Sequence, residues 1–282
     1  GSVAGFAAQS VPDLVWNSAL WPSNPTEAIR QALQDCHEQA RRDRLEGGST
    51  AVVLASTGGK LWCGFAGDSR AVARLHDGTV RPLSSEHLCT LEDEILRIKA
   101  AGADLEWGKV GGVLPMTRGI GNFGLEREGF ACLPEVRSVL RSEVDFVVVG
   151  SDGLWDVIGS QECCEIVRTS SASDKVANRI AETLAEEASR RWTNEHRTPD
   201  DIAVIVVFFA SDMDAPSPMC RTPQLERIVA GEALELPITV PFAWRFGGMA
   251  QLANFGLSDR PPPVVRELPF SSDAEDLPGD MN

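Results

Sequence analysis

Residues 144–153 read VDFVVVGSDG, an apolar run that ends in an aspartate turn, Ser151-Asp152-Gly153. A second apolar run covers residues 202–209, and the pair Asp200-Asp201 stands directly before it. Both runs predict buried strands, each with a carboxylate at one end. If the two strands lie side by side, the carboxylates meet, and they must then share a proton or hold a cation. The alternative is that each aspartate is a polar stop where a buried strand reaches solvent.

The size and charge of the chain set limits on its class. Its 282 residues are 43% hydrophobic and 24% charged, with a formal net charge of −15. These values predict a soluble globular protein of one large domain or two small ones. Binding to nucleic acid needs clustered Lys and Arg, so we expect no nucleic-acid partner. The longest apolar stretch, residues 202–210, is far shorter than the roughly 18 residues of a membrane helix, so we expect no membrane partner.

The cysteines give an indication of the compartment. There are seven, none in a CxxC pair, and Cys163 and Cys164 are adjacent. This usage predicts reduced thiols rather than a disulfide framework or a zinc site. We therefore expect a cytoplasmic or nuclear protein, with a monomer as the default state.

The composition divides the chain into two regions. Residues 1–211 alternate helical and strand patterns, whereas residues 212–282 hold ten of the seventeen prolines, including Pro261-Pro262-Pro263, and an acidic run at 273–276. We expect 212–282 to be a proline-rich acidic tail, partly disordered and outside the main core. Two apolar stretches, 238–246 and 249–255, leave local docking of this tail onto the domain open.

Hydrophobic periodicity predicts the elements of the first region. Expected helices cover residues 26–40, 91 to about 102 (after a capping box formed by Thr90 and Asp93), 161–168 and 174–191. Expected strands cover 50–56, 60–66, 70–76, 79–83, 136–140, 145–149 and 202–209, with hairpin turns at Gly58-Gly59 and Asp77-Gly78. Hairpins interleaved with helix pairs favour antiparallel sheets covered by helices.

Short motifs follow one another in a fixed order. They are Gly48-Ser49-Thr50-Ala51, Gly67-Asp68-Ser69-Arg70, Glu94-Ile95-Leu96-Arg97-Ile98, Gly112-Val113-Leu114 with Thr117-Arg118-Gly119-Ile120-Gly121, Pro134-Glu135-Val136, Ser151-Asp152-Gly153-Leu154-Trp155-Asp156, and Asp200-Asp201-Ile202-Ala203-Val204. Each is weak alone, but the ordered set is specific. In this order and spacing the chain resembles the metal-dependent type-2C Ser/Thr protein phosphatases over almost all of residues 1–210.

The resemblance implies an α+β fold, a four-layer αββα sandwich of two antiparallel sheets flanked by helix pairs. It also implies a centre of two Mg²⁺ or Mn²⁺ ions at one edge, for which Asp152 and Asp200 match carboxylate ligands. Asp68 and Asp156 match acidic residues that can help to hold a third, weaker ion. In such a centre a water that bridges the ions attacks phosphoserine or phosphothreonine in proteins.

Other roles are open for the single residues. Asp68 can be a turn aspartate that caps its own backbone, and Asp156 can bond neighbouring amides. Trp155 is expected to pack in the core, whereas Arg70 and Arg118 are expected to form structural ion pairs rather than phosphate clamps. The four histidines, His37, His76, His87 and His196, are scattered, and we expect surface or satisfied polar residues.

The chain departs from the family pattern at its start. The first metal motif, Asp-Gly-His-Gly-Gly, which carries the bridging aspartate and the proposed general acid, is absent from the 282 residues. Residues 1–8 look like the segment that follows it, so we expect a chain cut inside that motif, with its catalytic groups upstream of Gly1. Smaller departures are Asp201 in place of an asparagine, Asn122 in place of an aspartate, and Glu86-His87-Leu88-Cys89 in place of Asp-His-x-Pro.

The leading hypothesis is therefore a metal-dependent protein serine/threonine phosphatase that acts on phosphoprotein substrates in signalling. The rival is a catalytically inactive pseudophosphatase, an interaction scaffold that uses its proline-rich tail to recruit partners.

Overall fold

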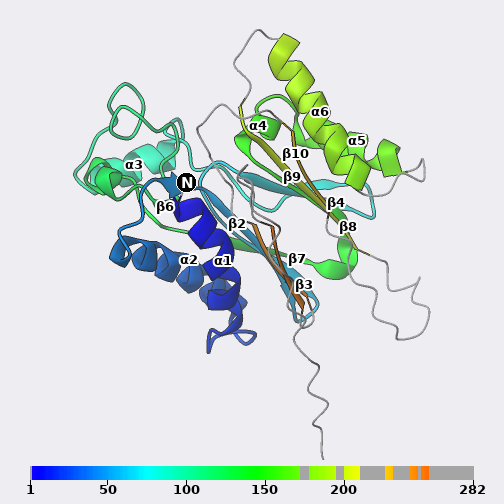
Figure 1. Ribbon diagram of the computed structural model, residues 1–282, viewed down its shortest axis with the longest axis horizontal. Helices are drawn as coiled ribbons and strands as arrows, with labels where there is room; N and C mark the ends of the chain where they lie inside the picture. The colour runs from blue at the N-terminus through cyan, green and yellow to red at the C-terminus, as the bar shows by residue number, and fades with distance from the viewer. Residues whose placement is uncertain are drawn as a thin grey trace, which may run out of the picture.

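Two stacked β-sheets form the centre of the protein, with helices on both outer faces (Figure 1). The computed structural model describes residues 2–171, 178–194, 200–209, 226–230, 242–246 and 249–253. One sheet has the order β12 (Met249–Ala253), β11 (Phe242–Phe246), β2 (Ala51–Thr57), β3 (Lys60–Ala66), β7 (Glu135–Leu140). The other has the order β10 (Glu226–Ala230), β9 (Ile202–Phe208), β8 (Val144–Gly150), β4 (Arg70–Leu75), β5 (Val80–Pro82).

Alternate residues of the central strands face different cores. In β8, Val147 and Val149 pack between the sheets, whereas Phe146 and Val148 face the helices. Successive side chains of a strand point to opposite faces, so a strand covered on both sides must be apolar throughout. This explains the uninterrupted apolar run FVVV at residues 146–149. The expected αββα sandwich is confirmed.

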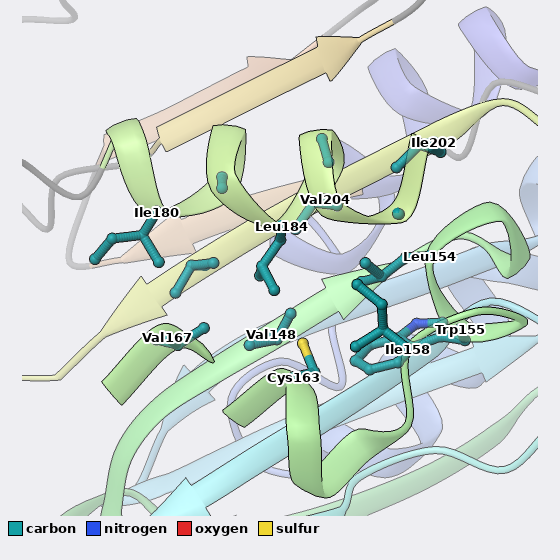
Figure 2. Close-up of a cluster of buried hydrophobic side chains, with 14 of the residues drawn as sticks. Val148, Leu154, Trp155, Ile158, Cys163, Val167, Ile180, Leu184, Ile202 and Val204 are labelled. Atoms are coloured by element: carbon teal, nitrogen blue, oxygen red, sulfur yellow. The ribbon is translucent and has the colours of Figure 1, made fainter. Parts of the chain in front are cut away.

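Three helices cover the β8–β9 face (Figure 2): α4 (Asp152–Trp155), α5 (Ser160–Ser171) and α6 (Asn178–Asn194). The apolar stripe of α6, Ile180, Leu184 and Ala188, is fully buried as its spacing predicts, while Val176 lies outside the described residues. Trp155 packs in this core, and its indole N–H donates to the carbonyls of Gly150 (2.9 Å) and Arg70 (3.1 Å).

Helices α1 (Ser2–Trp16) and α2 (Pro25–Arg42) cover the other outer face. The start of α2 follows from its sequence, because Pro25 fits the first helical turn and the Asn24 side chain accepts from the Glu27 amide at 3.3 Å. A short antiparallel pair of strands, β1 (Gly48–Ser49) and β6 (Ile120–Gly121), lies beside these helices. Two 3-10 helices also occur along the chain, η1 (Phe123–Glu128) after β6 and η2 (Arg141–Glu143) between β7 and β8. No described helix is long and apolar enough to span a membrane.

Both predicted hairpins form, but the predicted capping box does not. Helix α3 (Glu92–Ala100) begins after Leu91, which is extended (φ −84°, ψ 130°) and has no side-chain cap. The extended residue separates Thr90 from the first turn, and the Leu91 amide bonds the carbonyl of Leu88 instead. The predicted capping box between Thr90 and Asp93 was therefore wrong, whereas the helix predicted after it is confirmed.

Parts of region 212–282 extend the sheets. Strand β10 pairs antiparallel with β9, and β11 pairs parallel with β2, with Phe242 opposite Val52 and Ala243 opposite Val53. The docking that the apolar stretches left open is therefore present for residues 242–246 and 249–253. The remaining residues of 212–282, including Cys220, lie outside the described part of the chain, and so does His196. The domain boundary at residue 211 and the partial disorder of the tail therefore remain predictions.

A buried carboxylate fastens the α3 region to the sandwich. Glu94 is 2% exposed and accepts hydrogen bonds from Thr117, from Arg97 (3.0 Å) and from Arg118 (2.9 Å). Burial acts to raise the pKa of Glu94, but the bonds from Arg118 and Thr117 outweigh it and lower the pKa to about 2. Glu94 is therefore ionised and compensated, a structural ion cluster.

The α6 stripe predicts a large cavity penalty at Leu184. Leu184→Ala should lower the free energy of unfolding by about 2–5 kcal/mol, because the side chain is fully buried among α5, α6 and β8. Leu96→Ala, on α3 and 57% exposed, is the matched control and should change it by less than about 1 kcal/mol. Urea denaturation measures both, and equal losses would contradict the described packing.

Glu94 predicts a pH-dependent contribution to stability. At pH 7, Glu94→Gln should cost about 3 kcal/mol, because the pKa falls from 4.5 to about 2 at ~1.4 kcal/mol per unit. A depressed folded-state pKa means that this stabilisation is present above pH 4.5 and is lost as the pH falls towards about 2. Urea denaturation between pH 7 and pH 3 should show the gap closing.

The control for this experiment is Glu165→Gln, which removes an exposed ion pair with Arg168 on α5 and should follow the parent protein closely at each pH. A Glu94→Gln deficit that stayed constant with pH would contradict the assigned ion cluster.

Candidate metal-binding site at one edge of the sheets

The pairing of β8 with β9 brings Asp152 and Asp200 to one sheet edge. The strands are antiparallel with Gly150 opposite Val204, so the end of β8 lies beside the start of β9. Beyond the last pair, the Ser151 amide donates to the Ala203 carbonyl (3.0 Å), and the Ala203 amide donates to the Ser151 hydroxyl (3.0 Å). The two apolar runs therefore do lie side by side, which is the condition under which their carboxylates were expected to meet.

The residues around Asp152 fix its position. The Ser151 hydroxyl donates to the Asp201 carbonyl at 2.9 Å, which joins the first turn of α4 to the chain ahead of β9. Gly153 has no room for a side chain, since a Cβ there would lie 2.5 Å from the Asp201 carbonyl oxygen. Ser151 therefore provides a hydroxyl lock, the hydrogen bonds of its side chain with the Asp201 carbonyl and the Ala203 amide. Gly153 allows the two backbones to approach closely.

Asp68 reaches the same edge from the turn between β3 and β4. Strand β4 pairs with β8, and Arg70 lies opposite Gly150. The turn is tightly held: Gly67 has φ +114°, and the hydroxyls of Ser69 and Thr50 lie 2.8 Å apart. Asp68 is only 9% exposed at this position.

The electrostatics show that these carboxylates interact. Burial, followed by the charges of Asp68 and Asp200, raises the pKa of Asp152 to about 7. Burial also raises the pKa of Asp68 to about 6, with further increases from Glu86, Asp156 and Asp200. A backbone hydrogen bond at Asp68 itself acts in the opposite direction and lowers this pKa. Independent polar stops would not affect one another in this way.

Asp156 and Asp200 complete the group at its more open side. Asp156 follows α4, and its amide donates to the Asp152 carbonyl at 2.8 Å. Asp200 is half-buried and accepts from the Asp201 amide at 2.7 Å, whereas the Asp156 and Asp201 side chains are exposed. All four predicted acids therefore gather at one edge.

The donor chemistry of this edge suits a hard divalent cation. Its side chains offer carboxylate oxygens, which Mg²⁺ and Mn²⁺ prefer, and their mutual repulsion is what a cation relieves. Within the described residues, however, no three His, Cys, Asp or Glu side chains converge closely enough to hold an ion by themselves. The four aspartates thus fit as part of a donor set.

The other functional candidates have structural partners. Arg70 pairs with Glu86 (2.5 Å) and Ser160, and Arg118 pairs with Glu94 and Glu135, as predicted for structural ion pairs. The six cysteines within the described residues are free thiols, and five of them are buried. His37 and His87 are buried, and Nε2 of each ring lies within hydrogen-bond distance of a glutamate, Glu126 and Glu135 respectively. His76 is exposed.

Sequence reasoning missed two contributors, Ser151 and Glu86. Ser151 supplies the hydroxyl lock between α4 and β9. Glu86 is one of the carboxylates whose charge raises the pKa of Asp68, and its place in the divergent run Glu86-His87-Leu88-Cys89 was the available signal.

Known proteins resemble this chain in sequence. The family model described as protein phosphatase 2C matches residues 6–196. A probable protein phosphatase 2C of Caenorhabditis elegans is 35% identical over 174 residues, which cover 57% of this chain and 49% of the relative. A probable protein phosphatase 2C of Oryza sativa subsp. japonica is 31% identical over 211 residues, covering 73% and 40%. The chain spans about half the length of the curated relatives it matches.

Solved structures share the fold. A phosphatase from a pathogenic strain of Toxoplasma gondii superposes with TM-score 0.60 at 17% identity over 80% of this chain and 84% of that one. A C. elegans sex-determining protein gives TM-score 0.60 at 22% identity over 73% and 52%. At these identities the likeness concerns the fold alone. The family model covers well over half of the chain, and the chain therefore belongs to the protein phosphatase 2C family.

Proposed function

We propose that this chain supplies the phosphatase domain of a metal-dependent protein serine/threonine phosphatase that hydrolyses phosphoserine and phosphothreonine in phosphoproteins. The observation that carries the proposal is that the β8–β9 register brings Asp152 and Asp200 to one sheet edge, where burial and the charges of Asp68, Asp200 and Asp156 raise the pKa of Asp152. The chain's membership of the family supplies the reaction class. A cytoplasmic or nuclear location and a monomeric state remain predictions from the sequence.

The sign of the charge at this edge supports metal dependence. A phosphate group approaching clustered carboxylates would be repelled, so the edge can receive a phosphoprotein only when cations offset its charge. Asp152 and Asp200 would hold two Mg²⁺ or Mn²⁺ ions, with Asp68 and Asp156 available to a third. Bound ions would supply Lewis-acid activation of water and offset charge on the transferring group.

The chain's own residues prepare this edge in advance. Ser151 and Gly153 hold Asp152 against the segment ahead of β9, and the Thr50–Ser69 contact holds the Asp68 turn. Oxygen ligands fixed by the backbone lose little freedom when an ion binds. The proposed activity belongs to a protein that also carries the family's Asp-Gly-His-Gly-Gly segment. No observation in the described residues favours the scaffold alternative.

The proposal predicts the effect of removing Asp152. A protein in which Asp-Gly-His-Gly precedes Gly1 and completes the motif should hydrolyse a phosphothreonine peptide in Mn²⁺. Asp152→Asn should lower kcat/KM at least about 100-fold, because loss of a ligand costs more than loss of an outer contact. Initial rates of phosphate release with Mn²⁺ and with EDTA measure this.

The matched control is Asp145→Asn, which lies at the far end of β8, pairs with Arg74 at 2.8 Å and should keep the activity. In EDTA, Asp152→Asn should melt no lower than the parent, because it removes one of the clustered charges. Absence of Mn²⁺-dependent turnover in the parent protein would favour the scaffold and refute the proposal.

A further inference from the structure

His87 and Gly67 hold each other by two hydrogen bonds. The Gly67 amide donates to Nδ1 of His87 at 3.1 Å, and the His87 amide donates to the Gly67 carbonyl at 2.9 Å. Both residues are buried, and His87 is 2% exposed. The next residue after Gly67 is Asp68, so this pair adjoins the acidic edge from inside the protein.

The imidazole is itself fixed from other sides. Its ring stacks on Phe65 with centroids 5.5 Å apart and planes at 18°, and Nε2 lies 3.3 Å from Oε1 of Glu135 on β7. The His87 carbonyl accepts from the Thr117 amide at 2.8 Å. Because Nδ1 accepts a hydrogen bond, the neutral ring carries its proton on Nε2, facing Glu135.

Gly67 depends on this acceptor. Its φ of +114° is open to few other residues, and a Cβ there would lie 2.4 Å from Cγ2 of Thr50. The backbone therefore sits tightly against Thr50 on one side and bonds the imidazole through its amide. A buried amide that loses its only acceptor is costly, so the turn would move to find another.

We propose that His87 is a positioning residue that sets the orientation of the Gly67-Asp68 turn through the bond from the Gly67 amide to Nδ1. It touches no reacting group itself. Its effect on the acidic edge is transmitted through one peptide unit to Asp68, and the Glu135 contact selects the tautomer that leaves Nδ1 free to accept.

Substitutions at His87 can separate the two ring nitrogens. Asparagine places an amide oxygen near the position of Nδ1, whereas glutamine reaches towards the position of Nε2. In the 282-residue chain without added metal, His87→Ala and His87→Gln should speed hydrogen exchange of the Gly67 amide at least about tenfold relative to the Val148 amide. His87→Asn should restore near-parental exchange and the parental ¹³Cγ shift of Asp68.

His37 offers a matched control. It is 4% exposed, its Nδ1 accepts from the Gly121 amide at 3.1 Å, and its Nε2 lies 3.0 Å from Glu126. His37→Ala should destabilise the fold in a similar way but leave the Gly67 amide and the Asp68 shift unchanged. Equal behaviour of the Asn and Gln variants, or parental Gly67 exchange in His87→Ala, would overturn the proposal. If His87→Ala does not fold, the Asn and Gln variants decide.

A metal titration tests the consequence at the edge and rests on the proposed function. In proteins in which Asp-Gly-His-Gly precedes Gly1, Mn²⁺ should broaden the Asp68 amide signal in the parent and in His87→Asn at similar concentrations, and in His87→Gln only at concentrations several-fold higher. If Mn²⁺ broadens no signal of this edge in the parent protein, the proposed metal site fails, while exchange at Gly67 still decides the role of His87.

Discussion

The register between β8 and β9 is the constraint on which the site depends. A slip of one residue in a strand pair moves each side chain to the opposite face. Hydrophobic pattern usually prevents such a slip, but these strands are apolar on both faces and pattern alone restrains them weakly. Ser151 provides a polar lock, since its amide and hydroxyl bond Ala203 and its hydroxyl also reaches the Asp201 carbonyl. Position along the strands, and with it the arrival of Asp152 and Asp200 at one edge, is therefore determined by Ser151, the residue directly before Asp152.

Much of the fold could be predicted from the sequence because its signals are local. Two buried strands, two hairpins with glycine turns, and the stripe of α6 all follow from residue periodicity. The start of α3 could not be predicted from the Thr90–Asp93 pattern, because one extended residue, Leu91, separates the threonine from the helix. The strand partners of residues 242–246 could not be predicted either, since composition indicated an apolar patch and gave no strand register.

The sequence could predict which residues belong to the candidate site. It could predict only in part which contacts hold those residues in place. Motif order identified the four aspartates, and the register explains why they meet. The contacts that hold them involve residues far apart in the chain: Thr50 with Ser69, and His87 with Gly67. A hydroxyl or a lone histidine carries little signal without knowledge of its neighbour. Such supporting contacts depend on the topology of the fold. They can be identified only when the positions of the strands are known.

The buried carboxylates of this protein have pKa values shifted in opposite directions. The direction of the shift distinguishes a carboxylate whose charge the fold compensates from those whose charge it leaves uncompensated. Glu94 is buried beside Arg97 and Arg118, and its pKa is lowered to about 2, so the folded protein itself compensates its charge. For Asp152 and Asp68 the main influences are burial and other carboxylates, opposed by backbone hydrogen bonds, and both pKa values are raised. Arg70, the cation in the same turn, is engaged by Glu86 and Ser160 and lies 5.2 Å from the centre of the Trp155 ring. A fold that needed these aspartates only for stability would gain by placing the guanidinium between them. The uncompensated negative charge at this edge is what a divalent cation would offset, and this supports the proposed metal site.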